Sequence, residues 1–201
     1  MSDDYIYING DNGVDDYIMM SYPSNTHEGL ISEYVRQFGN YFHGCSRCIV
    51  RGSNTGLFLG HRWDLIKHLK SVQDYFADTI QAGNERKISI TPDLMVICDW
   101  AEDDFDGKGY HGIPKIVGEF WSPSTWRSDI TWKKDIYEAI GIQEYWIITD
   151  KSNVSIFRLT DGEYQVTDYQ LDDGDSDDNI LEIPCSLFGD LVIKIDRRLI
   201  Y

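Results

Sequence analysis

Two acidic side chains stand at the ends of apolar segments, where a soluble protein rarely places an unpaired charge. Asp93 directly precedes the apolar run Leu94 to Cys98, and Glu119 closes the run that begins at Ile116. A buried carboxylate is costly unless it is neutralised or finds a cation. Two strand-end carboxylates on adjacent strands therefore predict a binding site for a hard divalent ion.

A lysine from the following predicted helix completes the group. Four residues are spaced three, four and three positions apart and share one helical face: Ile130, Lys133, Tyr137 and Ile140. If the isoleucines face the core, Lys133 does so too, whereas Lys134 lies about 100° further round and can reach solvent. An inward ammonium needs a carboxylate, a metal-bound oxyanion or a substrate phosphate beside it. We therefore expect Lys133 to meet Asp93 and Glu119.

These three groups would suit metal-assisted hydrolysis of a phosphodiester. One or two Mg²⁺ ions held by Asp93 and Glu119, with Mn²⁺ as a substitute, would polarise a phosphate oxygen and lower the pKa of bound water. The Lys133 ammonium would orient that water or stabilise the developing negative charge. The candidate catalytic residues are thus Asp93, Glu119 and Lys133, and the first two are the candidate metal ligands.

Each residue taken alone also has an ordinary structural explanation. Asp93 could cap a turn at the start of its strand. Glu119 could pair with Arg127 or Lys115 instead, and Lys133 could extend its aliphatic stem outward to solvent. The order of the three residues along the predicted elements favours the shared site.

The net charge of −16 argues against a polyanionic partner only weakly. Half of the 34 acidic residues fall in three windows that contain no Lys or Arg: 1–16, 99–106 and 168–182. The remaining chain is close to neutral. This distribution predicts three solvated acidic loops and permits a DNA-binding groove without requiring one.

The pattern of apolar residues predicts one α/β domain over residues 1–201. Segments 24–42, 62–82 and 129–140 show helical spacing, with Asn25 as the first N-cap and Ser128 or Asp129 as the last. Apolar strands between them indicate a sheet covered on both faces. Residues 56–86 form a predicted helical insertion. Further strands are expected in these segments: YIYI, DYIMMS, residues 45–60, VSIFRL and EYQVTDYQL around the turn TDG, and DLVIKI.

The four cysteines are too few for a secreted disulfide framework. Cys45 and Cys48 form a C-x-x-C, which could supply half a zinc site or a redox pair, but Cys98 and Cys185 have no ligand-like spacing. We expect four reduced thiols.

The chain has no apolar run of about 18 residues and does not start like a secretory signal, so we expect a cytoplasmic protein without membrane contact.

Four segments resemble the Uma2 family of restriction-endonuclease-like proteins in the PD-(D/E)xK nuclease superfamily: SYPSNTHEGLI, TPDLMVICD, GIPKIVGEFWSPST and RSDITWKKDIYEAIGIQEYWIITD. They span most of residues 19–150. The resemblance implies the restriction-endonuclease-like fold, here with additional N- and C-terminal strands, metal-dependent cleavage of DNA, and homodimers. Asp93 matches the first acid of the family, Glu119 the second, and Lys133 a lysine displaced onto the following helix.

Three positions depart from the family or superfamily pattern. Trp121 stands where the usual E-x-K would place lysine, and Ile6 occupies the acidic position of the N-terminal Y-E-x-x-x-G motif. Residues 56–86 also form a longer segment than is usual. Ile6 and the net acidity favour an alternative function, a catalytically inactive nuclease-fold protein that binds nucleic acid or protein. The inward Lys133 favours the enzyme.

Overall fold

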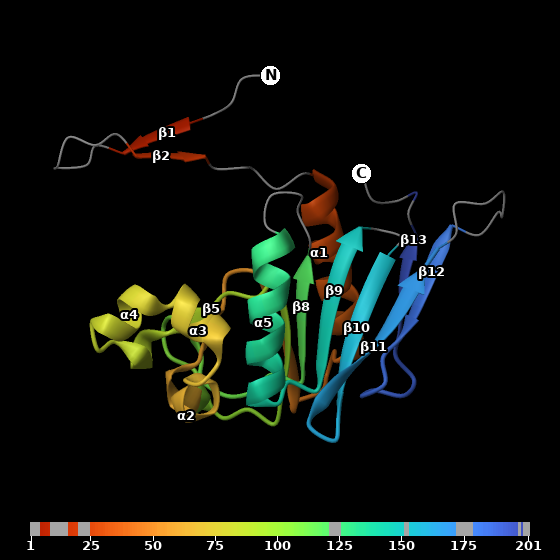
Figure 1. Cartoon of the computed structure of the whole chain (residues 1–201). Helices are drawn as coiled ribbons and strands as arrows, with labels where there is room; N and C mark the ends of the chain where they lie inside the picture. Colours follow the sequence, from red (N-terminus) through yellow and green to blue (C-terminus); the bar gives the residue numbers. More distant parts are fainter. Residues whose placement is uncertain are drawn as a thin grey trace.

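A mixed six-stranded β-sheet forms the centre of the protein (Figure 1). The computed structural model describes residues 5–8, 16–19, 25–120, 126–150, 153–171, 179–196 and 198. The strands follow the order β11-β10-β9-β8-β6-β3, and β8 and β9 are its one parallel pair. This sheet contains β3 (Cys48–Gly52), β6 (Leu94–Cys98), β8 (Ile116–Phe120), β9 (Glu144–Asp150), β10 (Asn153–Thr160) and β11 (Glu163–Gln170). The predicted mixed α/β fold class is confirmed.

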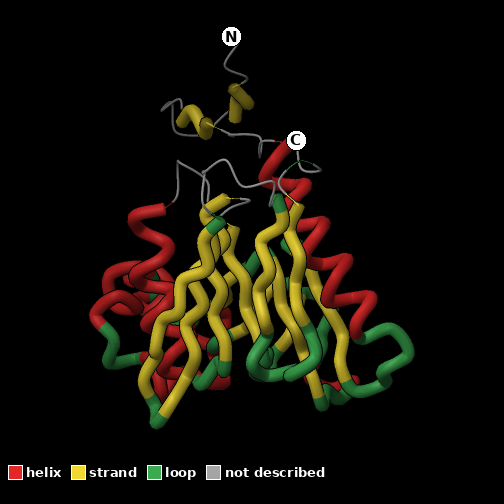
Figure 2. The backbone as a smooth tube through the Cα atoms, turned by 90° about the vertical axis from the view of Figure 1, so that its right-hand side faces the viewer, coloured by secondary structure: helices red, strands yellow, loops and turns green. Residues whose placement is uncertain are grey.

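Helices cover both faces of the central sheet (Figure 2). α1 (Asn25–Tyr41) packs on one face, where the paired strands β12 (Ile180–Pro184) and β13 (Val192–Asp196) share its apolar core. α5 (Trp126–Ile140) connects the parallel strands β8 and β9 and packs on the other face. The prediction of a sheet covered on both sides is therefore confirmed, whereas β12 was not expected from the sequence.

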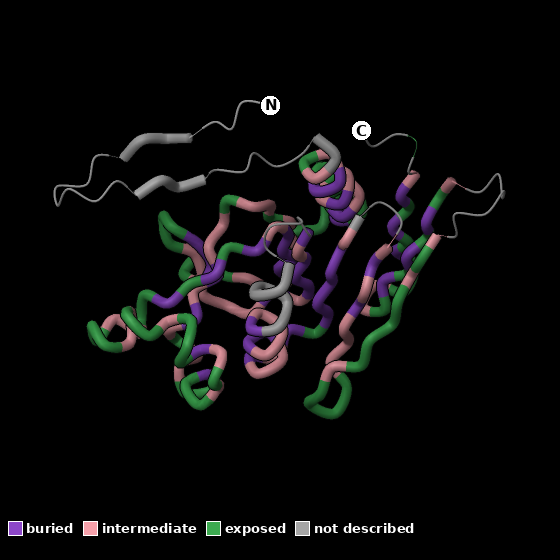
Figure 3. The backbone as a smooth tube through the Cα atoms, turned by 45° about the horizontal axis from the view of Figure 1, so that its top comes forward, coloured by how far each residue is buried: buried purple, intermediate pink, exposed green. Residues whose placement is uncertain are grey.

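The side chains of β6 alternate strictly between the two cores. Leu94 and Val96 pack on the α1 side, Met95 and Ile97 pack on the α5 side, and none of the four is exposed. A strand buried on both faces needs apolar residues at every position, which explains its continuous apolar sequence. Buried residues are concentrated in the central strands and on the faces of the helices that pack on them (Figure 3). Because the pleat has a period of two, continuing β6 back by one residue places Asp93 on the α5 side.

A small subdomain extends the core on the α5 side. The three-stranded sheet of β4 (Gly56–Phe58), β5 (Ser89–Ile90) and β7 (Gly109–Tyr110) lies beside three short helices. The helices are α2 (Trp63–Ile66), α3 (Lys70–Tyr75) and α4 (Ala77–Gln81), flanked by single 3₁₀ turns at Gly60–Arg62 and Glu85–Lys87. A third 3₁₀ turn, Glu102–Asp104, lies in the acidic loop before β7.

The prediction of one helix over residues 62–82 is wrong. Leu69 is extended, with ψ of 127°, and Phe76 also leaves the helical region. The apolar residues that suggested the helix do turn inward, and Ile66 and Val72 are fully buried. They reach one compact core with the short strands because the chain bends twice, which a straight helix could not do.

The observed ends of the other elements agree only in part with the caps and turns predicted from the sequence. Gly141 follows α5 with φ of +85°, the left-handed conformation expected of a glycine at C′. Asp161 and Gly162 both have positive φ and form the tight turn between β10 and β11, as TDG predicted. α5 begins at Trp126, so Ser128 and Asp129 lie inside the helix and the predicted N-cap is wrong.

The N-terminal strands β1 (Tyr5–Ile8) and β2 (Asp16–Met19) pair antiparallel, as expected. Of the three predicted acidic loops, 99–106 follows β6 and contains a 3₁₀ turn. The other two predictions are wrong in part, because 1–16 includes residues of β1 and β2, and 168–182 includes residues of β11 and β12. Residues 1–4, 9–15 and 172–178 of these windows lie outside the described residues. Among the helices that are described, none is long and apolar enough to span a membrane.

Two of the four cysteines are bonded to each other, so the prediction of four reduced thiols is wrong. Cys48 and Cys98 form a disulfide between β3 and β6, with their Cα atoms 4.0 Å apart. Cys45 is exposed and Cys185 is buried, and both are free thiols. The pairing depends on the register of two strands 50 residues apart in sequence, which spacing alone does not reveal.

A fully buried carboxylate, which sequence analysis did not single out, attaches the C-terminal strands to the central sheet. Glu144, at the start of β9, has no exposed surface and accepts a hydrogen bond from the Trp146 indole at 2.8 Å. The Arg158 guanidinium lies 3.3 Å from its other oxygen, and the Ser186 backbone N–H donates to that oxygen at 3.1 Å. Glu144 therefore links three segments through charge and hydrogen bonds.

We expect Glu144→Gln to lower the free energy of unfolding by about 3 kcal/mol, because it leaves the Arg158 charge without its buried partner. The matched control is Glu182→Gln, which removes an exposed carboxylate paired with Lys194 and should change stability by less than about 0.5 kcal/mol. Urea unfolding followed by tryptophan fluorescence measures both. Equal stability of the two variants would show that Glu144 contributes nothing beyond a surface ion pair.

Candidate active site

Asp93 and Glu119 lie opposite each other at one end of the sheet. Leu94 pairs with Gly118 in the antiparallel ladder between β6 and β8, so the next position brings Asp93 level with Glu119. Residues opposite each other in a ladder point to the same face. The Asp93 carboxylate also accepts a hydrogen bond from the Phe120 backbone N–H at 2.9 Å. The two predicted acids are thus brought together by strand pairing.

Lys133 reaches the same point from α5. Its ammonium lies 2.9 Å from Oε2 of Glu119, and both side chains are 12% exposed. The helical-face prediction for Lys133 is therefore confirmed, and the alternative of an outward lysine is excluded. Glu119 pairs with neither of the other suggested bases among the contacts described, although the side chain of Arg127 lies outside the described residues.

Tyr137 is a further member of this group. Its hydroxyl donates a hydrogen bond to Oε1 of Glu119 at 2.7 Å, so Lys133 and Tyr137 each hold one oxygen of the carboxylate. The two residues are four positions apart on α5, and residues at that spacing share a helical face. Sequence analysis placed Tyr137 on the inward face but gave it no role. The i, i+4 relation to Lys133 is the signal that could have done so.

His27 approaches the site from α1. Its Nε2 lies 3.1 Å from the Phe120 carbonyl oxygen, at the end of β8, and its ring makes an edge contact with the Phe120 ring at 6.3 Å between centroids. Phe120 therefore connects to Asp93 through its N–H and to His27 through its carbonyl group. Residues 121–125, between Phe120 and α5, lie outside the described residues.

Burial dominates the electrostatics of the site. It raises the pKa of Glu119 to about 7; the Lys133 ammonium opposes this rise, and the nearby Asp93 carboxylate adds to it. Burial also raises the pKa of Asp93, opposed by the hydrogen bond from the Phe120 N–H. The pKa of Tyr137 lies well above its ordinary value, mainly through burial, so its hydroxyl stays protonated as a donor. A cation between the two carboxylates would favour their ionised forms.

Two carboxylates are a donor set that would suit Mg²⁺. Within the described residues, no group of three or more His, Cys, Asp or Glu side chains gathers around one point. Mg²⁺ is usually held by one or two carboxylates and completes its shell with water and substrate phosphate. Asp93 and Glu119 meet that requirement, and an ionised carboxylate has lone pairs beyond those that Lys133 and Tyr137 use.

Comparison with known proteins identifies the family of the chain. The model of the Uma2 family, described as "Putative restriction endonuclease", matches residues 5–187. The chain belongs to the Uma2 family. The segments that carry the three candidate residues all lie inside the matched range.

One solved structure supports the fold of this Uma2 protein. It is the crystal structure of a putative nuclease belonging to DUF820 from Anabaena variabilis ATCC 29413, with 16% sequence identity and a TM-score of 0.56. The match covers 93% of this chain and 84% of that chain. At this identity, the likeness establishes a shared nuclease-like fold. A comparison with curated proteins found no significant match.

The raised pKa of Glu119 predicts a pH dependence of stability in metal-free buffer. Between its ordinary value of 4.5 and about 7, the folded state binds more protons than the unfolded state. The contribution of Glu119 is therefore fully present below pH 4.5 and is lost as pH rises through about 7, with a size on the order of 3 kcal/mol.

Urea unfolding from pH 4.5 to 8 in a chelator tests this prediction. We expect the difference in unfolding free energy between the wild type and Glu119→Gln to change across this window and to level off above it. The control Glu163→Gln, on exposed β11, should give a constant difference. A constant difference for Glu119→Gln as well would show that its carboxyl group titrates normally.

Proposed function

We propose that this protein is a metal-dependent endonuclease that hydrolyses phosphodiester bonds in DNA. The observation that carries the proposal is the 2.9 Å contact between the Lys133 ammonium and Glu119, which lies opposite Asp93 at the end of the sheet. The chain belongs to a family described as "Putative restriction endonuclease", which supports phosphodiester hydrolysis as the reaction. The DNA substrate and a homodimeric assembly follow from the resemblance to that family.

In this proposal Asp93 and Glu119 bind Mg²⁺, for which Mn²⁺ would substitute. The bound ion would polarise a phosphate oxygen and lower the pKa of a coordinated water. The protein's own contribution is geometric: Tyr137 and Lys133 each hold one Glu119 oxygen, and the Phe120 N–H orients Asp93. Lys133 would also stabilise the negative charge that develops on the phosphate in the transition state.

One exposed aromatic ring, stacked on a buried tryptophan next to Lys133, supports a nucleic-acid substrate. Tyr75, at the end of α3, is 56% exposed and stacks on Trp132 with 4.1 Å between ring centroids. The Trp132 ring in turn lies 5.9 Å from the Lys133 ammonium. Aromatic rings next to a cation are the features on which bases of single-stranded nucleic acid stack. Tyr75 would therefore contact a base that flanks the scissile phosphate.

A catalytically inactive binding protein is the second candidate. The net charge of −16 and the isoleucine at position 6 favour it. A binding protein would keep the nuclease fold and the metal site without cleaving the backbone. Lys133 separates the two candidates, because a binding site for a metal ion alone has no need of an inward ammonium.

Removing the Lys133 ammonium tests the proposed endonuclease activity. We expect Lys133→Ala to lower the rate of plasmid nicking in Mg²⁺ by about 10²-fold or more, the usual effect of losing one group that stabilises the transition state. The fold should persist, because Glu119 can take up a proton once its counter-charge is gone. The matched control is Lys134→Ala on the next helical position, where the side chain pairs with Glu138 at 3.7 Å. It should nick at the wild-type rate.

Two outcomes would contradict the proposal that the protein is an endonuclease. Equal loss in both lysine variants would indicate a general effect of charge, and no nicking by the wild type across DNA substrates and divalent ions would favour the binding protein. Circular dichroism of each variant confirms that the comparison is between folded proteins.

Metal binding is tested separately from cleavage. Asp93→Asn combined with Glu119→Gln should abolish the binding of Mn²⁺ measured by titration calorimetry, since neutral amides replace both ionised ligands. Lys133→Ala should still bind the ion. Unchanged Mn²⁺ binding in the double variant would place the metal site elsewhere in the protein.

A further inference from the structure

A cavity of about 690 Å³ lies at the opposite end of β6 from Asp93. Aromatic and aliphatic side chains line it on one side, from the end of α1 and from the segment between β12 and β13: Phe42, Leu187 and Phe188. Three of the four cysteines of the chain also line this cavity: Cys45, Cys48 and Cys98. The candidate active site uses none of these residues.

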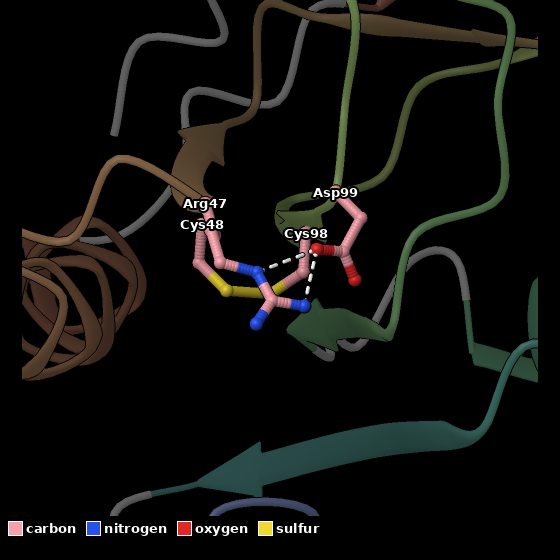
Figure 4. The surroundings of a disulfide bond; sticks show 4 residues. All are labelled: Arg47, Cys48, Cys98 and Asp99. Atoms are coloured by element: carbon pink, nitrogen blue, oxygen red, sulfur yellow. Dashed lines mark hydrogen bonds and ion pairs between the residues drawn. A yellow bond between two sulfur atoms is a disulfide. The ribbon is translucent and has the colours of Figure 1, made fainter.

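The disulfide joins the ends of two neighbouring strands at this cavity (Figure 4). Cys48 and Cys98 are partly buried partners at the end of the β3–β6 ladder. The next pair, Arg47 and Asp99, continues the ladder with a backbone hydrogen bond of 2.7 Å from Asp99 N–H to the Arg47 carbonyl group. The Arg47 guanidinium also bonds Asp99 Oδ1 at 2.8 Å beside the sulfur atoms.

The ion pair beside the disulfide is weakly held. The side chains of Arg47 and Asp99 are 76% and 53% exposed, and exposed ion pairs contribute little to stability. The pair can therefore move aside at small cost in free energy. The Cys45 thiol, which lines the same cavity, would then reach the Cys48 sulfur without any change in the sheet itself.

A third cysteine, Cys45, lines the same cavity as the disulfide. Cys45 lies in the turn between α1 and β3, three residues before Cys48, and it is exposed to solvent. A thiol at this C-x-x-C spacing can form a disulfide with its neighbour. Cys185, by contrast, is buried and lies 3.6 Å from the Glu144 carboxylate. The chain thus supplies one accessible thiol and one inaccessible thiol.

We propose that this cavity is a thiol–disulfide exchange site that reacts with low-molecular-weight thiols. The Cys45 thiolate attacks the sulfur of Cys48, and a bond forms between these two atoms while the Cys48–Cys98 bond breaks. The electron pair of the broken bond leaves on the Cys98 sulfur, which takes up the proton that Cys45 lost. The step is a rearrangement with no net oxidation.

A small thiol completes the reduction in two further exchanges. Its thiolate attacks the Cys45–Cys48 disulfide to give a mixed disulfide, and a second molecule of the thiol releases the protein dithiol and its own disulfide. Three protein thiols then remain in the cavity. The covalent link that closes the 50-residue loop containing α2, α3, α4 and β5 is lost, and β3 is held to β6 by hydrogen bonds and packing alone.

The first experiment establishes the bond in the full chain. After equilibration in an oxidising glutathione buffer, non-reducing peptide mapping should find Cys48 bonded to Cys98, with Cys45 and Cys185 free. Reduction should lower the melting temperature by about 10 °C, the effect expected for a cross-link that closes a loop of this length. Four free thiols after oxidation would overturn the proposal.

The second experiment traps the exchange. In Cys98→Ser under the same buffer, Cys45 should form a disulfide with Cys48, whereas the control Cys185→Ser should keep the Cys48–Cys98 bond.

A third experiment measures the rate at which the disulfide is reduced in the folded protein. It does not depend on Cys98→Ser, which removes a side chain packed against the core and could disturb the fold. Reduced glutathione should open the disulfide of Cys45→Ser at least about tenfold more slowly than that of the wild type. Equal rates, or a Cys98→Ser protein without the Cys45–Cys48 bond, would overturn the role of Cys45.

Discussion

The charge of Glu119, buried between the central sheet and α5, is the constraint on which the candidate site depends. A carboxylate at this depth must be protonated, paired or bound to a metal ion. The protein pairs it, through the ammonium of Lys133 and the hydroxyl of Tyr137. This pairing fixes the rotation of α5 about its axis, because both partners must face the sheet while Ile136 and Ile140 pack beside them.

The two hydrophobic cores have different roles: one packs the sheet together, and the other carries the candidate site. The α1 side holds the sheet together and attaches β12 and β13, with the buried Glu144 as the polar link. The α5 side carries the candidate site and the small subdomain whose Tyr75 reaches Trp132. The exchange site proposed at the other end of β6 shares this strand with Asp93.

Local periodicity made the central part of the fold and the geometry of the site predictable. Apolar runs located β6 and β8, and the 3.6-residue period placed Lys133 on the inward face of α5. The features that were missed depend on contacts between distant segments. The bends at Leu69 and Phe76 serve a core shared with β4 and β5, and the disulfide depends on the register of Cys48 against Cys98. Similarly, the sequence around Glu144 is that of an ordinary polar residue at the start of a strand. Its buried role depends on contacts with Arg158 and Ser186, which are distant in the sequence.

We propose that the acids at positions 93 and 119 share one hard cation or an adjacent pair of such cations. The most direct measurement is an anomalous difference map from a crystal soaked in Mn²⁺. The account predicts a single strong peak, or two adjacent peaks, within about 2.5 Å of carboxylate oxygens from both Asp93 and Glu119. A map with no peak between these carboxylates, while Mn²⁺ occupies other sites on the protein, would contradict it.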